Sequence, residues 1–136
     1  MKKLLCIAVM FMCTLGFSQS SVTSKSGVFN FVSETIDYGT IAKNDNGNRS
    51  FSFKNTGTAP IIITSVKGSC GCTVATKPSK PIMPNETAEI GVTYDTKRVG
   101  AFSKTITVVS NASEKNKVLR IKGSVTKENS TQVVTN

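Results

Sequence analysis

Alternation of apolar and polar positions is the main structural signal in this chain, and it recurs in short runs. In the segment from Arg49 to Lys54, for example, Phe51 and Phe53 share one face, and the serines and the lysine take the other. A side-chain period of two is that of a β-strand with one face buried. Seven extended segments of this kind are expected, with Gly, Pro, Asn or Asp between them: 28–32, 36–41, 49–54, 61–66, 87–94, 102–109 and 118–125. No long 3.6-residue periodicity interrupts them, so the pattern predicts an all-β domain.

Seven short strands with turn residues between them are typical of an immunoglobulin-like β-sandwich. Ten apolar side chains are expected to form its core, each contributing about 1.5 to 3 kcal/mol when fully buried: Phe51, Phe53, Ile61, Ile63, Val92, Tyr94, Phe102, Ile106, Leu119 and Ile121. The segment 61–66 is apolar on consecutive positions at its start, which favours a central strand covered on both sides. The segment from Lys77 to Pro84 holds three of the four prolines and is predicted to be a crossing loop.

The first 18 residues have the layout of a secretory signal. Lys2 and Lys3 precede an apolar run of 14 residues, Leu4 to Phe17, and small residues flank a cut before Gln19. The run is shorter than the roughly 20 residues that a membrane-spanning helix needs. We therefore expect a mature protein exported to the periplasm or beyond the cell, without membrane insertion. Its expected parts are a signal peptide at 1–18, a linker at 19–27, the sandwich at 28–125 and a flexible polar tail at 126–136.

Charge and composition argue against two classes of function, nucleic-acid binding and catalysis. Without Lys2 and Lys3 the chain keeps 15 Lys and Arg against 8 Asp and Glu, a net charge of +7, but the lysines are scattered and form no basic stripe with interleaved aromatics. No nucleic-acid partner is expected. The chain has no His, so proton transfer near neutral pH would fall on carboxylates or lysines. Glu86 and Glu89 lie three apart at the start of a strand and are expected on opposite faces. The sequence predicts neither an enzyme nor a cofactor.

Cys70 and Cys72 are the cysteines left after Cys6 and Cys13 leave with the signal peptide. Residues two apart on an extended strand are separated by about 6.6 Å, whereas the Cβ atoms of a disulfide lie about 3.8 Å apart. A bridge therefore requires a bend at Gly71, which glycine permits. Closing so small a ring stabilises the fold by about 1.6 kcal/mol, which the strain of a tight ring can cancel.

Three interpretations of the cysteine pair stay open. The two side chains pack the end of the 61–66 strand as thiols or as an incidental bridge; they form a strained, redox-active disulfide; or they hold a soft metal such as Cu(I) or Zn(II). The metal interpretation lacks further ligands, because the chain has no His and Met83 is the only Met of the mature chain.

Several segments together resemble a known family. They are I-D-Y-G-T-I at 36–41, F-S-F-K-N-T-G-T-A-P at 51–60, S-C-G-C-T at 69–73, and the later segments 82–94, 100–111 and 119–125. This order is similar to that of the secreted bacterial domain-of-unknown-function family fifteen-seventy-three, itself similar to Hydin-like and major-sperm-protein-like immunoglobulin folds. The resemblance covers about residues 28 to 125. It implies a β-sandwich and no enzymatic activity. Asn85 stands where the family often has Gly, and Asn also accepts a left-handed turn.

These observations lead to one hypothesis and its competitors. We expect an exported, non-enzymatic immunoglobulin-like binding or structural module of the bacterial envelope, whose partner is an unknown envelope protein or polymer. Its expected contact surface is a sheet edge or the loops near Cys70 and at 77–84; the second loop carries Lys77, Lys80 and Met83 and is expected beside the cysteines. The alternative is a thiol-dependent redox protein or a soft-metal (copper) binding protein that uses Cys70 and Cys72. A purely structural role in an envelope assembly is the third.

Overall fold

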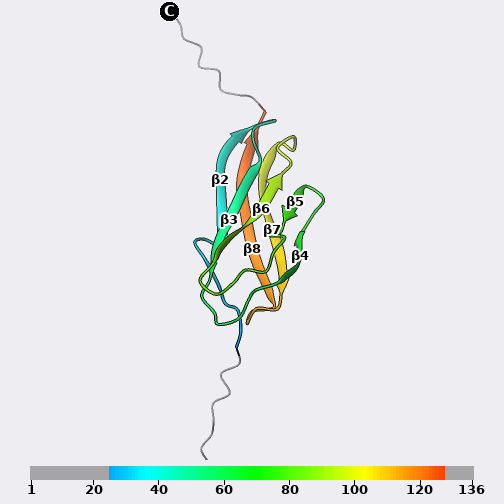
Figure 1. Ribbon diagram of the computed structural model, residues 1–136. Helices are drawn as coiled ribbons and strands as arrows, with labels where there is room; N and C mark the ends of the chain where they lie inside the picture. Colours follow the sequence, from blue (N-terminus) through cyan, green and yellow to red (C-terminus); the bar gives the residue numbers. More distant parts are fainter. Residues whose placement is uncertain (1–24, 128–136) are drawn as a thin grey trace, which may run out of the picture.

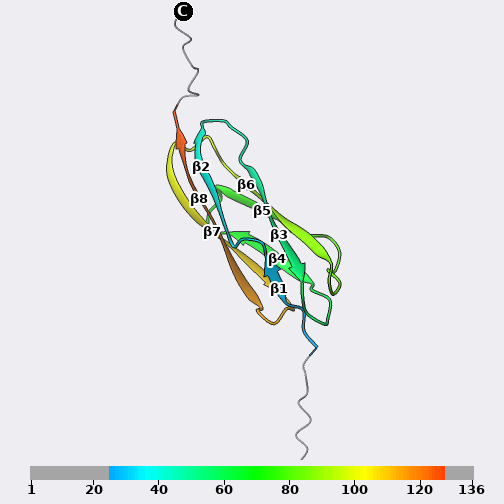
Figure 2. The same ribbon diagram turned by 90° about the vertical axis from the view of Figure 1, so that its left-hand side faces the viewer.

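The computed structural model describes residues 25–127, which form eight strands and no helix. The strands are β1 (Phe29–Phe31), β2 (Thr35–Ala42), β3 (Asn48–Asn55), β4 (Ile63–Gly68), β5 (Thr73–Thr76), β6 (Thr87–Tyr94), β7 (Gly100–Ser110) and β8 (Asn116–Thr126). They form two four-stranded sheets, one in the order β1-β3-β6-β5 and the other in the order β2-β8-β7-β4. The sheets lie face to face as two layers (Figure 1, Figure 2). The predicted immunoglobulin-like sandwich is confirmed.

The core lies between the two sheets and contains all ten predicted side chains, each with at most 7% of its surface exposed. Strand alternation explains this, because side chains two apart on a strand face the same layer. The structure adds five large side chains to the predicted set: Tyr38, Ile82, Ile90, Val108 and Val125. Aromatic rings close both ends of the core. Tyr94 stacks on Phe102 with ring centroids 3.8 Å apart, and Phe53 packs against Phe29 with centroids 5.1 Å apart.

The prediction of a central strand at 61–66 is wrong. The strand there, β4, begins at Ile63 and lies at the edge of its sheet, paired with β7 alone. Ile61 and Ile63 are buried, but Ile62 between them is 48% exposed, so the apolar run is covered on one side only. Ile61 pairs instead with Ile82 of the proline-rich loop, in a bridge outside the named strands.

β5 is a strand that the alternation did not predict. It has four residues, Thr-Val-Ala-Thr, and it lies at the edge of its sheet. β4 precedes the cysteine pair and β5 follows it, so an edge strand borders the pair on each side. Its brevity left too few positions for a period of two to be recognised. β4 and β5 belong to different sheets, so the segment that joins them crosses from one layer to the other.

The ends of the predicted domain can be compared with the structure in part. Ser26 and Gly27 of the predicted linker already bond to the sandwich, because their carbonyls accept hydrogen bonds from Thr58 N and Ser113 N. β8 extends to Thr126, the first residue of the predicted tail. The predicted signal peptide and residues 128–136 lie outside the described residues. Between residues 25 and 127, no helix is long and apolar enough to cross a membrane.

The connections gather at two ends of the sandwich, with the described chain entering at one and leaving at the other (Figure 1). At the first end, here called the disulfide end, hydrogen bonds link the connections β2–β3, β4–β5 and β6–β7. Examples are the bonds from Asn44 N to Thr96 O and from Asp95 N to Cys72 O. The second, here called the proline-loop end, joins the segments around Asn55, Ile61 and Ile82.

Candidate functional site

Cys70 and Cys72 form a disulfide in the connection from β4 to β5, with their Cα atoms 5.2 Å apart. Gly71 between them is exposed, and a Cβ built on it would meet no atom within 4 Å. The left-handed glycines of the described chain are Gly39 and Gly100, so the bend at Gly71 uses backbone angles open to other residues. The bend predicted from the spacing is present, but it does not require glycine.

Main-chain hydrogen bonds hold this turn on both sides of the disulfide. Ser69 N donates to Thr105 O of β7 at 2.9 Å, and Asp95 N donates to Cys72 O, also at 2.9 Å. Thr73 N closes the turn by donating to Cys70 O at 3.2 Å. The turn is therefore fixed to both sheets by bonds that do not involve sulfur.

The two sulfurs sit in different surroundings. Cys70 is half-buried, whereas Cys72 is 4% exposed and belongs to the core. The Thr73 hydroxyl, itself in a buried residue, lies 3.8 Å from Cys70 Sγ and 3.9 Å from Cys72 Sγ. Cys70 is thus the more exposed residue of the disulfide and Cys72 the enclosed one, with a hydroxyl shared between their sulfurs.

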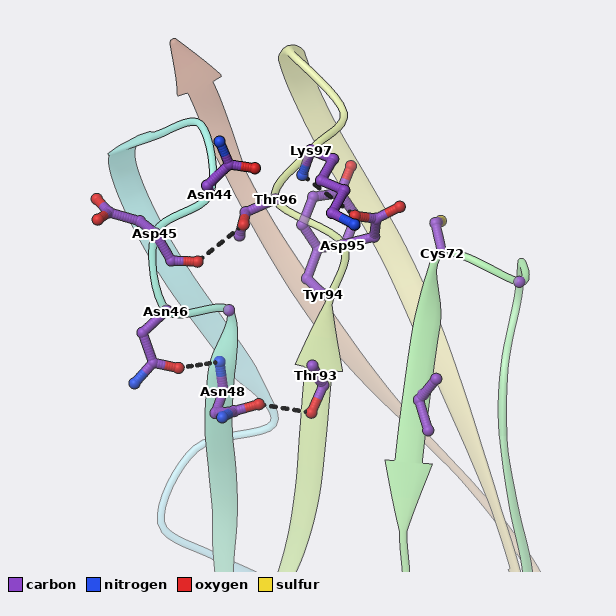
Figure 3. A pocket seen from close by; sticks show the side chains of 13 residues that line it. Asn44, Asp45, Asn46, Asn48, Cys72, Thr93, Tyr94, Asp95, Thr96 and Lys97 are labelled. Carbon is purple, nitrogen blue, oxygen red and sulfur yellow. Dashed lines mark hydrogen bonds between the residues drawn. The ribbon is translucent and has the colours of Figure 1, made fainter. Parts of the chain in front are cut away.

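A hollow of about 490 Å³ opens beside the disulfide. Figure 3 shows its walls: the turn with Asn44 and Asp45 on one side, Cys72 on the other, and Tyr94 with its neighbours between them. Gly47 is buried at its base, where its carbonyl accepts bonds from Tyr38 Oη at 2.8 Å and Tyr94 N at 3.0 Å. Three remote segments therefore build the hollow.

Several polar side chains line the hollow, and some of them bond to neighbouring residues of its wall. Thr93 Oγ1 donates to Asn48 Oδ1 at 2.7 Å, and Thr96 Oγ1 donates to Asp45 O at 2.8 Å. Burial raises the pKa of the Tyr94 hydroxyl above its ordinary value, so it stays protonated at neutral pH. Within residues 25–127, no three His, Cys, Asp or Glu side chains cluster as metal ligands.

The second candidate region is the proline-rich loop, where Lys77, Lys80 and Met83 are all exposed. Met83 has 53% of its surface exposed, but its neighbour Ile82 is buried at 2%. Ile82 bonds to Ile61 in both directions, N to O and O to N, at 2.9 and 2.8 Å. The loop is thus anchored at its centre while the neighbouring side chains face outward.

Asn55 and Glu86 fix the rest of this loop. Asn55 Nδ2 donates to Ile82 O at 2.9 Å, and Asn85 N donates to Asn55 O at 2.7 Å. Glu86 folds back so that its carboxylate accepts the Met83 amide at 2.7 Å. Asn85 takes the left-handed conformation expected of it, with φ of 68°. Glu89 instead accepts a bond from the Ser52 hydroxyl at 2.9 Å, so the two glutamates do not pair.

The structure separates the two predicted site regions. The cysteines border the disulfide end, where Cys72 O meets Asp95 N, whereas Ile82 and Asn85 join Ile61 and Asn55 at the proline-loop end. The expectation that the loop lies beside the cysteines is therefore wrong, because β5 carries the chain away from them. The hollow is not predicted by the sequence analysis: the segment 44–48 is expected as a turn and 87–94 as a strand, and nothing in the sequence brings them together.

Comparison with models of known protein families shows which family the chain belongs to. Residues 29–125 match the family described as "Protein of unknown function (DUF1573)". The chain belongs to this family. The resemblance inferred from these segments is thereby confirmed, and it covers both candidate regions of this family member. No curated protein matches the sequence.

Solved structures similar to this family member share its fold at low sequence identity. A protein of unknown function from Porphyromonas gingivalis W83 has a TM-score of 0.65 and 16% identity over 74% of this chain and 47% of that one. The chain thus spans about half the length of that protein. The ASH/PapD-like domain 7 of human CEP192 has a TM-score of 0.58 and 11% identity, covering 77% and 89%. The protease VesB of Vibrio cholerae has a TM-score of 0.56 and 11% identity, covering 73% and 32%.

Proposed function

We propose that this family member is an exported, non-catalytic binding module of the bacterial envelope that contacts its partner through the proline-rich loop. The export rests on the signal-like pattern of residues 1–18. The binding role rests on one observation: Lys77, Lys80 and Met83 are exposed on a loop whose backbone is fixed at Ile82. A fixed loop loses little conformational entropy on binding, which favours recognition.

The charges near this loop favour an acidic protein surface as the partner. No ion pair joins Lys77 or Lys80 to another described residue, and the carboxylate of Glu86, at the end of the same loop, accepts the Met83 amide. The exposed thioether of Met83 gains free energy only when an apolar surface covers it. We therefore propose a protein partner with an apolar pocket bordered by carboxylates, rather than a charged polymer.

The engagement of the acidic side chains supports a non-catalytic role. Every Asp and Glu side chain between residues 25 and 127 is bound to a cation, a backbone amide or a hydroxyl, and none is paired with a second carboxylate: Glu34, Asp37, Asp45, Glu86, Glu89, Asp95 and Glu114. A general acid and a general base made from two carboxylates would need such a pair, with separated pKa values and facing one substrate.

A charge-reversal experiment tests the proposal. The variant K77E/K80E is compared with K43E/K127E, which makes the same change of net charge at exposed lysines toward the disulfide end. After the partner is identified from cells by chemical cross-linking and mass spectrometry, we expect K77E/K80E to weaken its affinity about tenfold or more. The control should change it less than about twofold, because distant exposed charges are screened by salt.

Two results would contradict the proposal. Equal effects of the two variants would show that total charge, rather than this loop, drives binding. Binding to a polymer with no protein partner would contradict the protein surface proposed here. Restoration of the K77E/K80E affinity by exchanging a partner carboxylate for lysine would establish the contact directly.

A further inference from the structure

We propose that the Cys70–Cys72 disulfide exchanges with a dithiol of an extended peptide seated in the adjoining hollow, with Cys70 as the sulfur that is attacked. This activity lies at the disulfide end and is independent of the partner surface proposed above. Three features of the described residues carry the inference: the redundancy of the disulfide in the fold, the unequal burial of its sulfurs, and the position of the hollow.

The first feature is that the disulfide is not needed to hold its turn. Ser69, Thr73 and Asp95 each donate a backbone hydrogen bond that fixes the same segment, at 2.9, 3.2 and 2.9 Å. A bridge between residues two apart also constrains the unfolded chain less than a bridge that closes a long loop. Reduction should therefore leave the turn and the sandwich in place, as a reversible exchange requires.

The second feature is access to one sulfur. Cys70 is half-buried, and the space over its neighbour Gly71 is empty within 4 Å of a Cβ position. Cys72 is enclosed at 4% exposure. Thiol–disulfide exchange needs the attacking thiolate to reach a sulfur, so the accessible one is the electrophile. The Thr73 hydroxyl, 3.9 Å from Cys72 Sγ, is placed to donate to that sulfur when it leaves as a thiolate.

The third feature is the hollow itself, which reaches the disulfide along Gly71 and Cys72; Cys70 does not line it but directly precedes Gly71, so a peptide that extends past Gly71 meets Cys70. Val74, on the edge strand β5, lines it with 62% of its surface exposed. Thr93 and Asn48 continue the row from Val74 across the same face of the sheet, and their side chains bond to each other. An exposed apolar side chain on an edge strand suits an extended peptide, which presents both side chains and main-chain amides.

The exchange balances in two steps. A thiolate of the peptide attacks Cys70 Sγ, the Cys70–Cys72 bond breaks, and Cys72 Sγ leaves with the electron pair and takes up a proton. The second peptide thiolate then attacks the peptide sulfur of the mixed disulfide, and Cys70 Sγ leaves and is protonated. The peptide loses two electrons and two protons, and the cysteine pair gains them. A separate protein disulfide of the same compartment re-oxidises the pair.

The order of attack is tested with single-cysteine variants and an aromatic disulfide reagent. Cys70 in C72S should react at least about tenfold faster than Cys72 in C70S, because thiol reactivity follows access. As a second measurement, the wild-type protein is reduced and treated with limiting iodoacetamide, and the labelled cysteine is located by mass spectrometry. Preferential labelling of Cys70 supports the inference, whereas equal labelling or a faster Cys72 overturns it.

The role of the hollow is tested with a reduced synthetic peptide of eight residues that contains two cysteines. V74D is compared with V118D, which changes an equally accessible valine, 52% exposed, on the other sheet. We expect V74D to slow oxidation of the peptide by the protein at least about fivefold and to slow oxidation of dithiothreitol less, because dithiothreitol does not fill the hollow. V118D should alter neither rate. Equal slowing by both variants, or no exchange with the peptide by the wild-type protein, would overturn the inference.

Discussion

Replacing Asn55 is the sharpest test of how the proline-rich loop is held. Asn55 is fully buried at the end of β3, and its side chain makes four hydrogen bonds. Its Oδ1 accepts from Val28 N at 3.2 Å and Gly57 N at 3.0 Å, and its Nδ2 donates to Ala59 O and Ile82 O, each at 2.9 Å. The side chain thus joins the residue before β1, the turn after β3 and the loop that carries Met83.

The expected cost of Asn55→Ala follows from these bonds. The bond to Ile82 O is buried, but this carbonyl keeps the hydrogen bond from Ile61 N, so the loss of the Asn55 bond costs about 0.5 to 1.5 kcal/mol. The other three are partly buried, and each lost bond costs about 0.5 to 1.5 kcal/mol. We expect a total loss of about 3 to 5 kcal/mol, which lowers Tm by more than about 12 °C in a domain of this size.

Urea denaturation with wild-type, N55A, N55D and the control N116A measures the effect. Asn116 is exposed at the start of β8, so its replacement should stay within about 0.5 kcal/mol. In N55D a carboxylate oxygen replaces the amide nitrogen that faces the carbonyls of Ala59 and Ile82. This repulsion raises the pKa of the new carboxyl in the folded protein. The unfolding free energy of N55D should therefore increase as the pH falls below 7. A loss below about 1 kcal/mol in N55A would refute the reasoning.

Three further predictions concern other contacts. Gly47→Ala should cost about 2 kcal/mol or more, because a methyl there would overlap the Tyr94 carbonyl, whereas Gly71→Ala, which meets nothing within 4 Å, should stay within about 0.5 kcal/mol in the same denaturation assay. The Gly39 amide and the Lys122 ammonium lower the pKa of Asp37 in the folded protein. The ionised side chain therefore stabilises the fold above its ordinary pKa, and this stabilisation is lost as the pH falls through the lowered pKa. The difference in unfolding free energy between wild-type and D37N should shrink from about pH 4 to pH 2. Met83→Ala should weaken binding of the identified partner about fivefold, because covering its half-exposed side chain is worth about 1 kcal/mol; an unchanged Kd in calorimetry would place Met83 outside the contact.

The sequence predicted the elements whose signal is local. Alternation at Phe51 and Phe53 identified β3, and the Asn- and Gly-rich segment 44–48 identified the turn after β2. Both signals depend on neighbouring residues, since strand period and left-handed turns are properties of short segments. The left-handed conformation of Asn85 was predictable for the same reason.

Features that depend on remote segments were not predictable. Ile61 is buried because it pairs with Ile82, 21 positions away, and nothing local distinguished that pairing from a central strand. The hollow arises only when the turn at Asn46, the end of β6 and the start of β5 meet. The distance between the cysteines and Met83 likewise follows from the direction of β5 rather than from their proximity in sequence.

Site-specific photo-cross-linking in cells tests the central claim, that the proline-rich loop contacts a protein partner, most directly. A photoreactive phenylalanine analogue replaces Met83 in one variant and Val118, similarly exposed on the other sheet, in the control. We expect a discrete cross-linked protein from position 83, absent from position 118 and lost when K77E/K80E is added. No adduct at position 83, or the same adduct from both positions, would contradict the claim.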